Sequence, residues 1–338
     1  MTGLCGWALG ERSADPAEAR SLLKGMSQTL NRAGGEAVSL VAGGAGCFVR
    51  SWRQEPRAVE TEGVIAAIDG APVWDNASLA DIALRQGHPA AVAAGYERFG
   101  DRFLASLKGS FTVAVIDTRR QRLLLAIDRL GLGRLYHARS ADGTLVFGST
   151  ADAVAAHPGV ASTVSEQGVF DYLFFYMSPA PATIYREQSK LLAGEMLVAD
   201  PDSARTERYW HMPYREIATE SEETLEEELR DRLAASVARS VDGESTERVG
   251  AFLSGGLDSS TMTGLLCQKT GAPIKAFTIG FDTAGFDEMP YAVAAARHFG
   301  AKHVSYYIRS DDLVDAVPLL AAGYDFRIRC RAVIRRCR

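Results

Sequence analysis

The sequence predicts an α+β domain followed by a partial α/β domain with a doubly wound parallel sheet, and three observations support this. The first 200 residues contain short apolar runs of strand length, separated by turn residues and interrupted by few helical patterns. After residue 222, strands and helices alternate regularly. A chain of 338 residues is also long enough for two domains that each bury a core.

The first domain is assigned to residues 1–200. The predicted strands lie at 37–41, 63–68, 110–116, 122–127 and 143–147, and helical patterns occur at 16–32 and 89–99. Because helices do not follow strands in turn, the pattern favours an α+β arrangement. The segment 117–121, with sequence DTRRQ, has the composition of a hairpin turn between two of the strands.

The second domain, 222–326, follows a charged connector at 201–221 that contains Pro201 and Pro213. It begins with a helical pattern over 222–241, which has acidic residues in its first turns, where they suit the helix dipole. Strands predicted at 248–253, 274–279 and 303–308 then alternate with helices at 259–270 and 291–299. This order is typical of a doubly wound parallel sheet.

The tail at 327–338 breaks every preceding pattern, because it holds six arginines and two of the five cysteines. A basic tail that binds nucleic acid is one interpretation. We prefer out-of-frame translation or a truncated gene product, since the sheet is left unfinished in mid-domain.

Composition narrows the functional classes. The net charge of −5 provides no cationic field for nucleic acid, and no apolar run reaches the roughly 18 residues of a membrane helix. Without a signal-peptide pattern, the cytoplasm is the expected location. The cysteines (Cys5, Cys47, Cys267, Cys330 and Cys337) contain no CxxC pair and the six histidines are scattered, so neither disulfides nor zinc are indicated.

The strongest motif is Ser254-Gly-Gly-Leu-Asp-Ser-Ser260, which lies between a predicted buried strand ending at Leu253 and a predicted helix. Doubly wound folds bind ligands at such a position. Gly255 and Gly256 let the backbone approach an anion, and the helix start offers unpaired N–H groups. Ser254, Ser259 and Ser260 add hydroxyl groups. Asp258 would repel a phosphate unless Mg²⁺ lies between them, so it is the candidate metal contact.

This loop resembles the SGGxDS loop of the ATP pyrophosphatase group, whose members cleave ATP between the α and β phosphates and pass AMP to a carboxylate or carbonyl oxygen. The resemblance continues at 276–281 (AFTIGF), which implies that Ile279 and Gly280 line an adenine pocket. Further matches at 109–117, 128–136, 146–149, 207–210, 286–292 and 299–303 are colinear with glutamine-dependent asparagine synthetase. The chain is therefore identified as a member of the asparagine synthetase family, which includes β-lactam synthetase and lasso-peptide cyclase relatives.

The resemblance implies a class II glutamine amidotransferase-like first domain of stacked antiparallel sheets, as in Ntn hydrolases. In the family, an N-terminal cysteine attacks glutamine and its free α-amine serves as base. Cys5-Gly6 resembles that pair, but four residues precede Cys5. Arg50 is the candidate for gripping the glutamine carboxylate, and Asp69-Gly70-Ala71 stands where the family has Asn-Gly-Glu.

These departures predict a damaged glutaminase. A carboxylate at position 69 has the wrong sign for an oxyanion, and Ala71 has no side chain to receive an ammonium group. The family's later acid, in a Gly-Ser-Asp segment, falls near 87–89, where no acid stands. The second glycine-acid loop of the family does not follow, and 324–326 resembles only the start of its acceptor-substrate segment.

The resemblance implies an ATP- and Mg²⁺-dependent ligase that adenylates a carboxylate and forms an amide with glutamine, ammonia or an internal amine as donor. Asparagine synthesis from aspartate is the family activity. Two alternatives stay open: a peptide or lactam cyclase with an inactive glutaminase domain, and a non-catalytic product. The acceptor, the amine source and homodimerisation are left open by the sequence.

Overall fold

The computed structural model describes residues 3–10, 15–30, 36–51, 57–214, 219–242, 244–283, 285 and 287–323. They divide into two compact units, which we call the N-terminal unit, ending at Met212, and the C-terminal unit, beginning at Pro213. This division falls inside the 201–221 segment predicted as a connector. The predictions made for 324–326 and for the tail at 327–338 lie outside the described residues.

Two six-stranded antiparallel sheets build the N-terminal unit. Sheet A has the order β10 (Ser189–Lys190), β8 (Tyr136–Arg139), β9 (Leu145–Gly148), β1 (Gly3–Ala8), β3 (Ala45–Ser51), β2 (Glu36–Ala42). Sheet B has the order β12 (Ala204–Arg208), β11 (Glu195–Ala199), β7 (Arg122–Ile127), β6 (Leu107–Asp117), β5 (Val64–Trp74), β4 (Ala58–Thr61).

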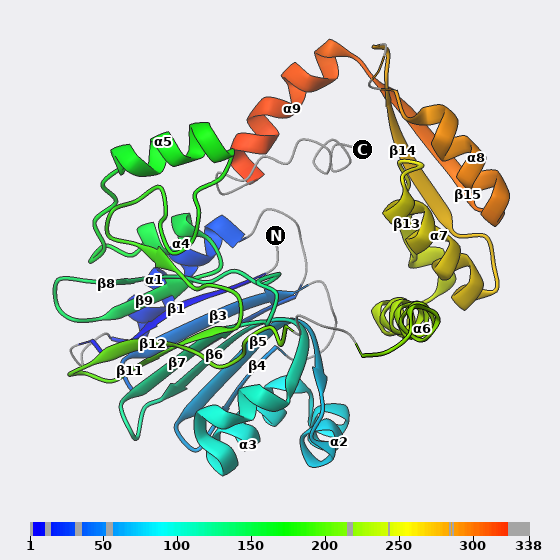
Figure 1. The fold of residues 1–338 in the computed structure, drawn as a ribbon. Coiled ribbons are helices and arrows are strands. Elements are labelled where there is room, and N and C mark those ends of the chain that lie inside the picture. The colour runs from blue at the N-terminus through cyan, green and yellow to red at the C-terminus, as the bar shows by residue number, and fades with distance from the viewer. Residues whose placement is uncertain are drawn as a thin grey trace. The chain divides into compact units, whose positions relative to one another are not determined.

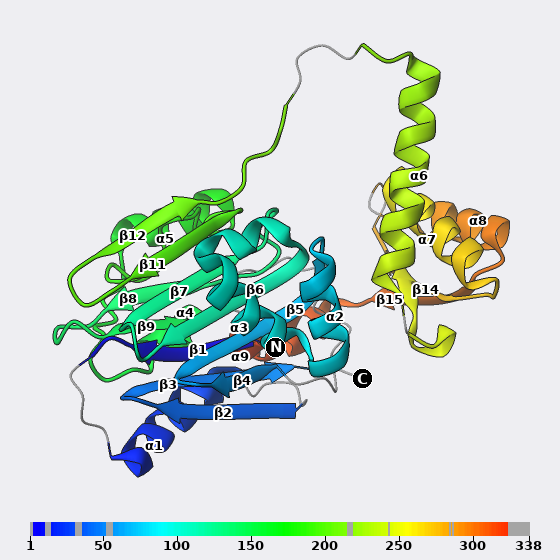
Figure 2. The ribbon, with the colours of Figure 1, turned by 90° about the horizontal axis from the view of Figure 1, so that it is seen from below.

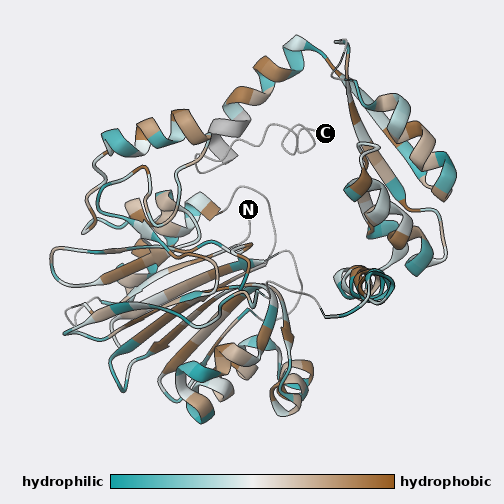
Figure 3. Cartoon of the chain, in the orientation of Figure 1, coloured by the Kyte–Doolittle hydropathy of each residue, from teal (hydrophilic) through white to brown (hydrophobic). Residues whose placement is uncertain are grey.

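The sheets stack face to face between two layers of helices (Figures 1 and 2). One buried cluster fills the space between the sheets, a second lies between sheet B and α3 (His88–Phe99), and a third lies between sheet A and α1 (Pro16–Ser27) with α4 (Ala151–Ala155). Both faces of the central strands are therefore covered, so these strands are continuous apolar runs (Figure 3). The unit also contains η1 (Gln28–Leu30), α2 (Ala77–Gln86), η2 (Gly100–Ser106) and α5 (Glu166–Phe175).

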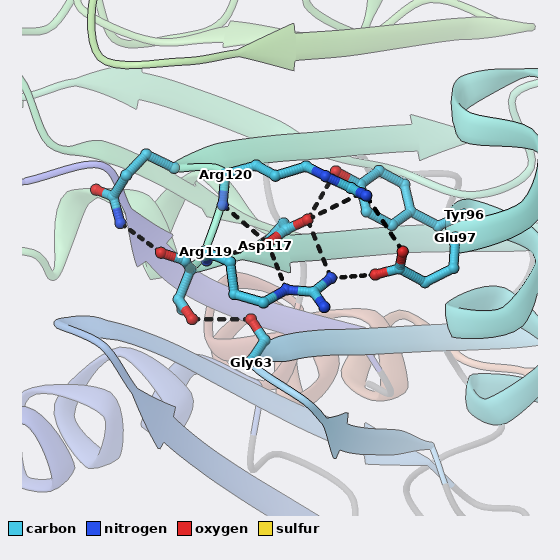
Figure 4. A network of polar contacts seen from close by, with 8 residues as sticks. Gly63, Tyr96, Glu97, Asp117, Arg119 and Arg120 are labelled. Carbon is cyan, nitrogen blue, oxygen red and sulfur yellow. Dashed lines mark hydrogen bonds and ion pairs between the residues drawn. The ribbon is translucent and has the colours of Figure 1, made fainter.

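The predicted hairpin turn is confirmed between β6 and β7, and a buried carboxylate holds it (Figure 4). Asp117 accepts hydrogen bonds from the backbone N–H groups of Arg119 and Arg120, both at 3.0 Å, and pairs with both guanidinium groups at 3.2–3.3 Å. The Tyr96 hydroxyl donates to the same carboxylate at 3.3 Å, and Glu97 pairs with the two arginines from α3. Burial alone would raise the pKa of Asp117, but the bonds from Arg120 and Arg119 outweigh it and lower that pKa.

The C-terminal unit is a parallel sheet with helices in the crossovers. Its strands have the order β13 (Gly250–Phe252), β14 (Lys275–Phe281), β15 (Lys302–Ile308). The helices are α6 (Glu222–Ser240), α7 (Leu257–Thr270), α8 (Met289–Phe299) and α9 (Ser310–Gly323), with η3 (Thr246–Arg248) before β13. α6 packs against α7 (Figure 2), and Val237, Val249, Leu266 and Ile274 form a small core there.

The predicted fold class is confirmed in both units. The sequence did not indicate β12, whose five residues are all exposed and mostly polar, because its strand character comes from pairing with β11 and not from apolar alternation. β1 was missed as well, because Gly3 and Gly6 interrupt its apolar run. Among the described residues, no helix is long and apolar enough to cross a membrane.

Candidate functional site

The segment Ser254 to Ser260 lies at the carboxyl edge of the parallel sheet, between β13 and α7. Leu253 is 2% exposed and donates its N–H to the carbonyl of Phe277 at 2.8 Å, which continues the pairing with β14 up to the start of the loop. The strand, turn and helix predicted from the sequence are therefore all present. The turn opens at the sheet edge where doubly wound folds bind ligands.

The two serines at either end of the turn bind each other. The N–H of Ser254 donates to Oγ of Ser259 at 3.1 Å, and the two hydroxyl oxygens are 2.9 Å apart. Oγ of Ser254 also accepts from the N–H of Gly256 at 3.3 Å. These hydroxyl groups therefore hold the loop in its turn conformation.

The start of α7 carries N–H groups without a side-chain cap. The first intrahelical bond joins the N–H of Ser260 to the carbonyl of Gly256 at 3.0 Å, so the N–H groups of residues 257–259 precede the helical ladder. Gly256 occupies the cap position and makes no side-chain bond, whereas α1, α2, α4, α5 and α6 each have a capping side chain. An anion could satisfy these donors, and the helix dipole would favour it.

Asp258 lies on the first turn of α7 with its side chain exposed. Within the described ranges, no group of three or more His, Cys, Asp or Glu side chains is arranged to hold a metal ion. A single carboxylate nevertheless fits Mg²⁺, which proteins often bind through one or two carboxylates together with substrate phosphates. The exposed carboxylate of Asp258 is therefore compatible with a Mg²⁺ site shared with a phosphate.

Gly255 permits the close approach of the loop to α8. Its φ is +82°, a conformation that L-residues rarely adopt. A Cβ at this position would lie 2.4 Å from Cβ of Tyr291 and 2.5 Å from the backbone nitrogen of Ala292. The glycine is therefore required by backbone conformation and by packing together.

The proposed adenine-pocket residues lie at the carboxyl end of β14, beside the loop. Ile279 is half-buried and Gly280 is buried. A Cβ on Gly280 would approach the ring of Tyr307 at 2.7 Å and the methyl carbon of Met289 at 2.9 Å. Gly280 thus packs against β15 and α8, while Ile279 points to the opposite face of the sheet.

Sequence reasoning missed two polar pairs near this edge. Oγ1 of Thr278 contacts the carbonyl of Leu253 and the imidazole of His303, each at 2.7 Å. The hydroxyl of Tyr307 donates to Asp287 at 3.1 Å, and this bond raises the pKa of Tyr307. The threonine and tyrosine occur in strands where propensity explains them, so no sequence signal distinguished them.

Cys5 lies in the middle of β1, opposite Phe48 of β3 and Gly148 of β9. It is 0% exposed, and burial, followed by the charge of neighbouring Cys47, raises the pKa of its thiol well above the ordinary value. The preceding Leu4 is also part of the strand, and its N–H and C=O both bond to Ser149 at 3.0 and 2.8 Å. The thiol is thus neither exposed nor next to a free amine within the strand.

The candidate glutamine-binding residues lie on different sheets. Arg50 is at the end of β3 opposite Gly3, with its guanidinium 5.9 Å from the ring centroid of Phe48, whereas Asp69 and Gly70 lie in β5. The carbonyl of Gly70 accepts a bond from Nη1 of Arg57 at 3.3 Å, and Arg57 is only 3% exposed. Arg57, which the sequence did not single out, therefore places a cation beside Gly70.

Two family models match the chain. The model described as "Glutamine amidotransferase domain" matches residues 87–210, and the model described as "Asparagine synthase" matches residues 228–331. The first falls in the N-terminal unit, and the second includes the loop at 254–260.

Curated relatives include proteins described as glutamine-hydrolyzing asparagine synthetases. A "putative asparagine synthetase [glutamine-hydrolyzing]" of Mycobacterium tuberculosis is 31% identical over 69% of this chain and 36% of its own length. "Asparagine synthetase [glutamine-hydrolyzing] 3" of Bacillus subtilis is 30% identical over 62% of this chain and 36% of its own length. The chain thus spans about a third of the length of these relatives.

Among solved structures, glutamine phosphoribosylpyrophosphate amidotransferase from B. subtilis has a TM-score of 0.41 at 13% identity, covering 91% of this chain and 81% of that chain. The two family models and the asparagine synthetase relatives carry the assignment. The chain belongs to the asparagine synthetase family, with a glutamine amidotransferase domain followed by an asparagine synthase domain.

Proposed function

We propose that the protein is an ATP-dependent amide ligase that activates a carboxylate as an acyl-adenylate on the 254–260 loop. The observation that carries this proposal is the uncapped first turn of α7 at the carboxyl edge of the sheet, entered through a loop that the Ser254–Ser259 bonds hold in place. Fixed N–H donors of this kind stabilise phosphate charge without reorganising during the reaction.

The proposed reaction has two steps, adenylation of the carboxylate and formation of the amide. An oxygen of the carboxylate bonds to the α-phosphorus, the bond to the oxygen bridging to the β-phosphorus breaks, and pyrophosphate leaves with that electron pair. Mg²⁺, when bound, would neutralise phosphate charge, and Asp258 is the residue that would hold it. An amine nitrogen then bonds to the acyl carbon, AMP leaves, and the amine loses a proton to solvent.

The amine donor in this proposal is ammonia or an amine of the acceptor itself, and not glutamine hydrolysed by Cys5. The buried thiol has a raised pKa, so little thiolate is available, and Gly3 and Leu4, which precede it, are paired into sheet A. This observation also favours a second candidate, intramolecular amide closure, which needs no glutaminase.

Pyrophosphate release by the full chain tests the proposal. Aspartate is supplied with Mg·ATP and either ammonium or glutamine, and ATP–pyrophosphate exchange is measured with other carboxylates. We expect ammonium-dependent release that Asp258→Asn lowers at least tenfold, while the exposed control Asp231→Asn on α6 leaves it unchanged. A folded protein that neither binds Mg·ATP nor releases pyrophosphate with any of these carboxylates would sink the proposal.

A further inference from the structure

Thr278 links the parallel sheet to the start of the 254–260 loop. Thr278 is 3% exposed, and its side chain lies on the face of β14 that also carries buried Ala276 and Gly280. Oγ1 is 2.7 Å from the carbonyl oxygen of Leu253 and 2.7 Å from Nε2 of His303 in β15. One hydroxyl of β14 therefore contacts both β15 and the residue that follows β13.

The direction of the two hydrogen bonds follows from the number of protons. A carbonyl oxygen can only accept, so the single hydroxyl proton of Thr278 is donated to Leu253. Oγ1 must then accept from His303, which requires the imidazole to carry a proton on Nε2. The chain thus runs from the His303 N–H through the Thr278 hydroxyl to the Leu253 carbonyl.

Leu253 is the residue from which the loop departs. Its N–H is bonded to the carbonyl of Phe277 at 2.8 Å and its C=O to Thr278, so β14 holds both of its backbone polar groups. The next residue, Ser254, donates its N–H to Ser259. The orientation of the Leu253 peptide therefore sets the direction in which that N–H and the turn after it point.

We propose that Thr278 and His303 are positioning residues that orient the 254–260 loop through the carbonyl of Leu253. This inference rests on the proposed function, since it assigns the loop to ATP binding. The simpler alternative is that Thr278 is only a satisfied buried hydroxyl, in which case its loss would affect stability but not the loop or ATP.

Matched variants separate the effect of the Thr278 hydroxyl group from the effect of side-chain volume. Thr278→Val keeps the volume and removes the hydroxyl, whereas Thr278→Ser keeps the hydroxyl. His303→Leu removes the N–H donor, and His303→Gln retains one. We expect Thr278→Val to weaken Mg·ATP binding, measured calorimetrically on the full chain, by about tenfold, and Thr278→Ser to stay within about twofold of the unmodified protein.

Two further measurements do not depend on ATP. Hydrogen exchange of the Ser254 and Gly256 amides should accelerate about tenfold in Thr278→Val and remain unchanged in Thr278→Ser. Nitrogen NMR of the unmodified protein should find the proton of the neutral His303 ring on Nε2. A neutral ring protonated on Nδ1 alone, or unchanged loop exchange in a folded Thr278→Val protein, would overturn the inference.

A double variant tests whether the two residues act in one chain. Because His303 reaches the loop through the hydroxyl, Thr278→Val/His303→Leu should match Thr278→Val within about twofold, and fully multiplicative effects would contradict the relay. His303→Gln should recover most of what His303→Leu loses. If the unmodified protein binds no Mg·ATP, the proposed function fails, while loop exchange and the His303 tautomer still decide this inference.

Discussion

Replacing Gly255 by alanine should destabilise the C-terminal unit more than alanine at another glycine with similar backbone conformation. Gly255 and Gly271 both have positive φ, at +82° and +62°. Only Gly255 is crowded, since a Cβ on Gly271 would meet no atom within 4 Å. The pair therefore separates the cost of the left-handed backbone from the cost of the contact with α8.

The magnitude can be worked from these contacts. A left-handed L-residue costs about 1–2 kcal/mol, and this applies to both variants. At Gly255 the new Cβ would lie 2.4 Å from Cβ of Tyr291 and 2.5 Å from backbone atoms of α8, which cannot rotate away. Overpacking of this kind adds about 1–3 kcal/mol, so we expect a total loss of roughly 2–5 kcal/mol for Gly255→Ala.

The assay needs a separate probe for each unit, so that a loss of stability can be assigned to the C-terminal unit. All four tryptophans lie at positions 7, 52, 74 and 210, so tryptophan fluorescence follows the N-terminal unit during urea unfolding. Hydrogen exchange of α7 and α8 follows the other unit, and a loss of about 2 kcal/mol corresponds to acceleration of roughly 30-fold. The fluorescence transition should not move.

Gly256→Ala is a second control within the same loop. Gly256 has φ of −72°, and its Cβ would lie 3.3 Å from the rotatable hydroxyl of Ser254. We expect a cost below about 1 kcal/mol for this variant. If Gly255→Ala costs no more than Gly271→Ala within about 0.5 kcal/mol, the packing argument at α8 is wrong.

Three other predictions concern the N-terminal unit. Asp117→Asn should lower the free energy of unfolding of this unit by about 2 kcal/mol, measured by urea unfolding at pH 7. Because the pKa of Asp117 is lowered in the folded state, the difference in stability between the two proteins should shrink as the pH falls below about 4. An unchanged urea midpoint at pH 7 would contradict this prediction. Burial lowers the pKa of His137 to about 4, so the unfolded state binds a proton at higher pH than the folded state does. The free energy of unfolding should therefore fall by roughly 1–3 kcal/mol as the pH is lowered from about 6.5 to 4. In unfolding curves measured in parallel, His137→Gln should flatten this pH dependence, and equal slopes in the two proteins would refute the assignment. Cys5→Ser should leave ammonium-dependent pyrophosphate release unchanged. In the folded protein, Cys5 should resist alkylation by iodoacetamide until the protein unfolds. Rapid alkylation of the folded protein, detected by mass spectrometry, would show that the thiol is accessible.

Much of the fold was predictable because local signals agreed with the tertiary structure. The segments 63–68, 110–116 and 122–127 lie in β5, β6 and β7, whose central residues are buried on both faces and therefore read as apolar runs. Exposed edge strands carry no such signal. β12 is recognisable only through its pairing with β11, because its own five residues are all exposed and show no apolar alternation.

The features of the candidate site likewise fall into those that the sequence predicted and those that only the tertiary structure shows. The sequence by itself determined the 254–260 loop, because two glycines and three hydroxyl residues between a strand and a helix have a local conformational meaning. Only the tertiary structure decided that Thr278 and His303 meet at Leu253, and that Cys5 is enclosed between β3 and β9. Those relations arise from strand register and from the stacking of layers, which bring together residues whose local sequences are independent of one another.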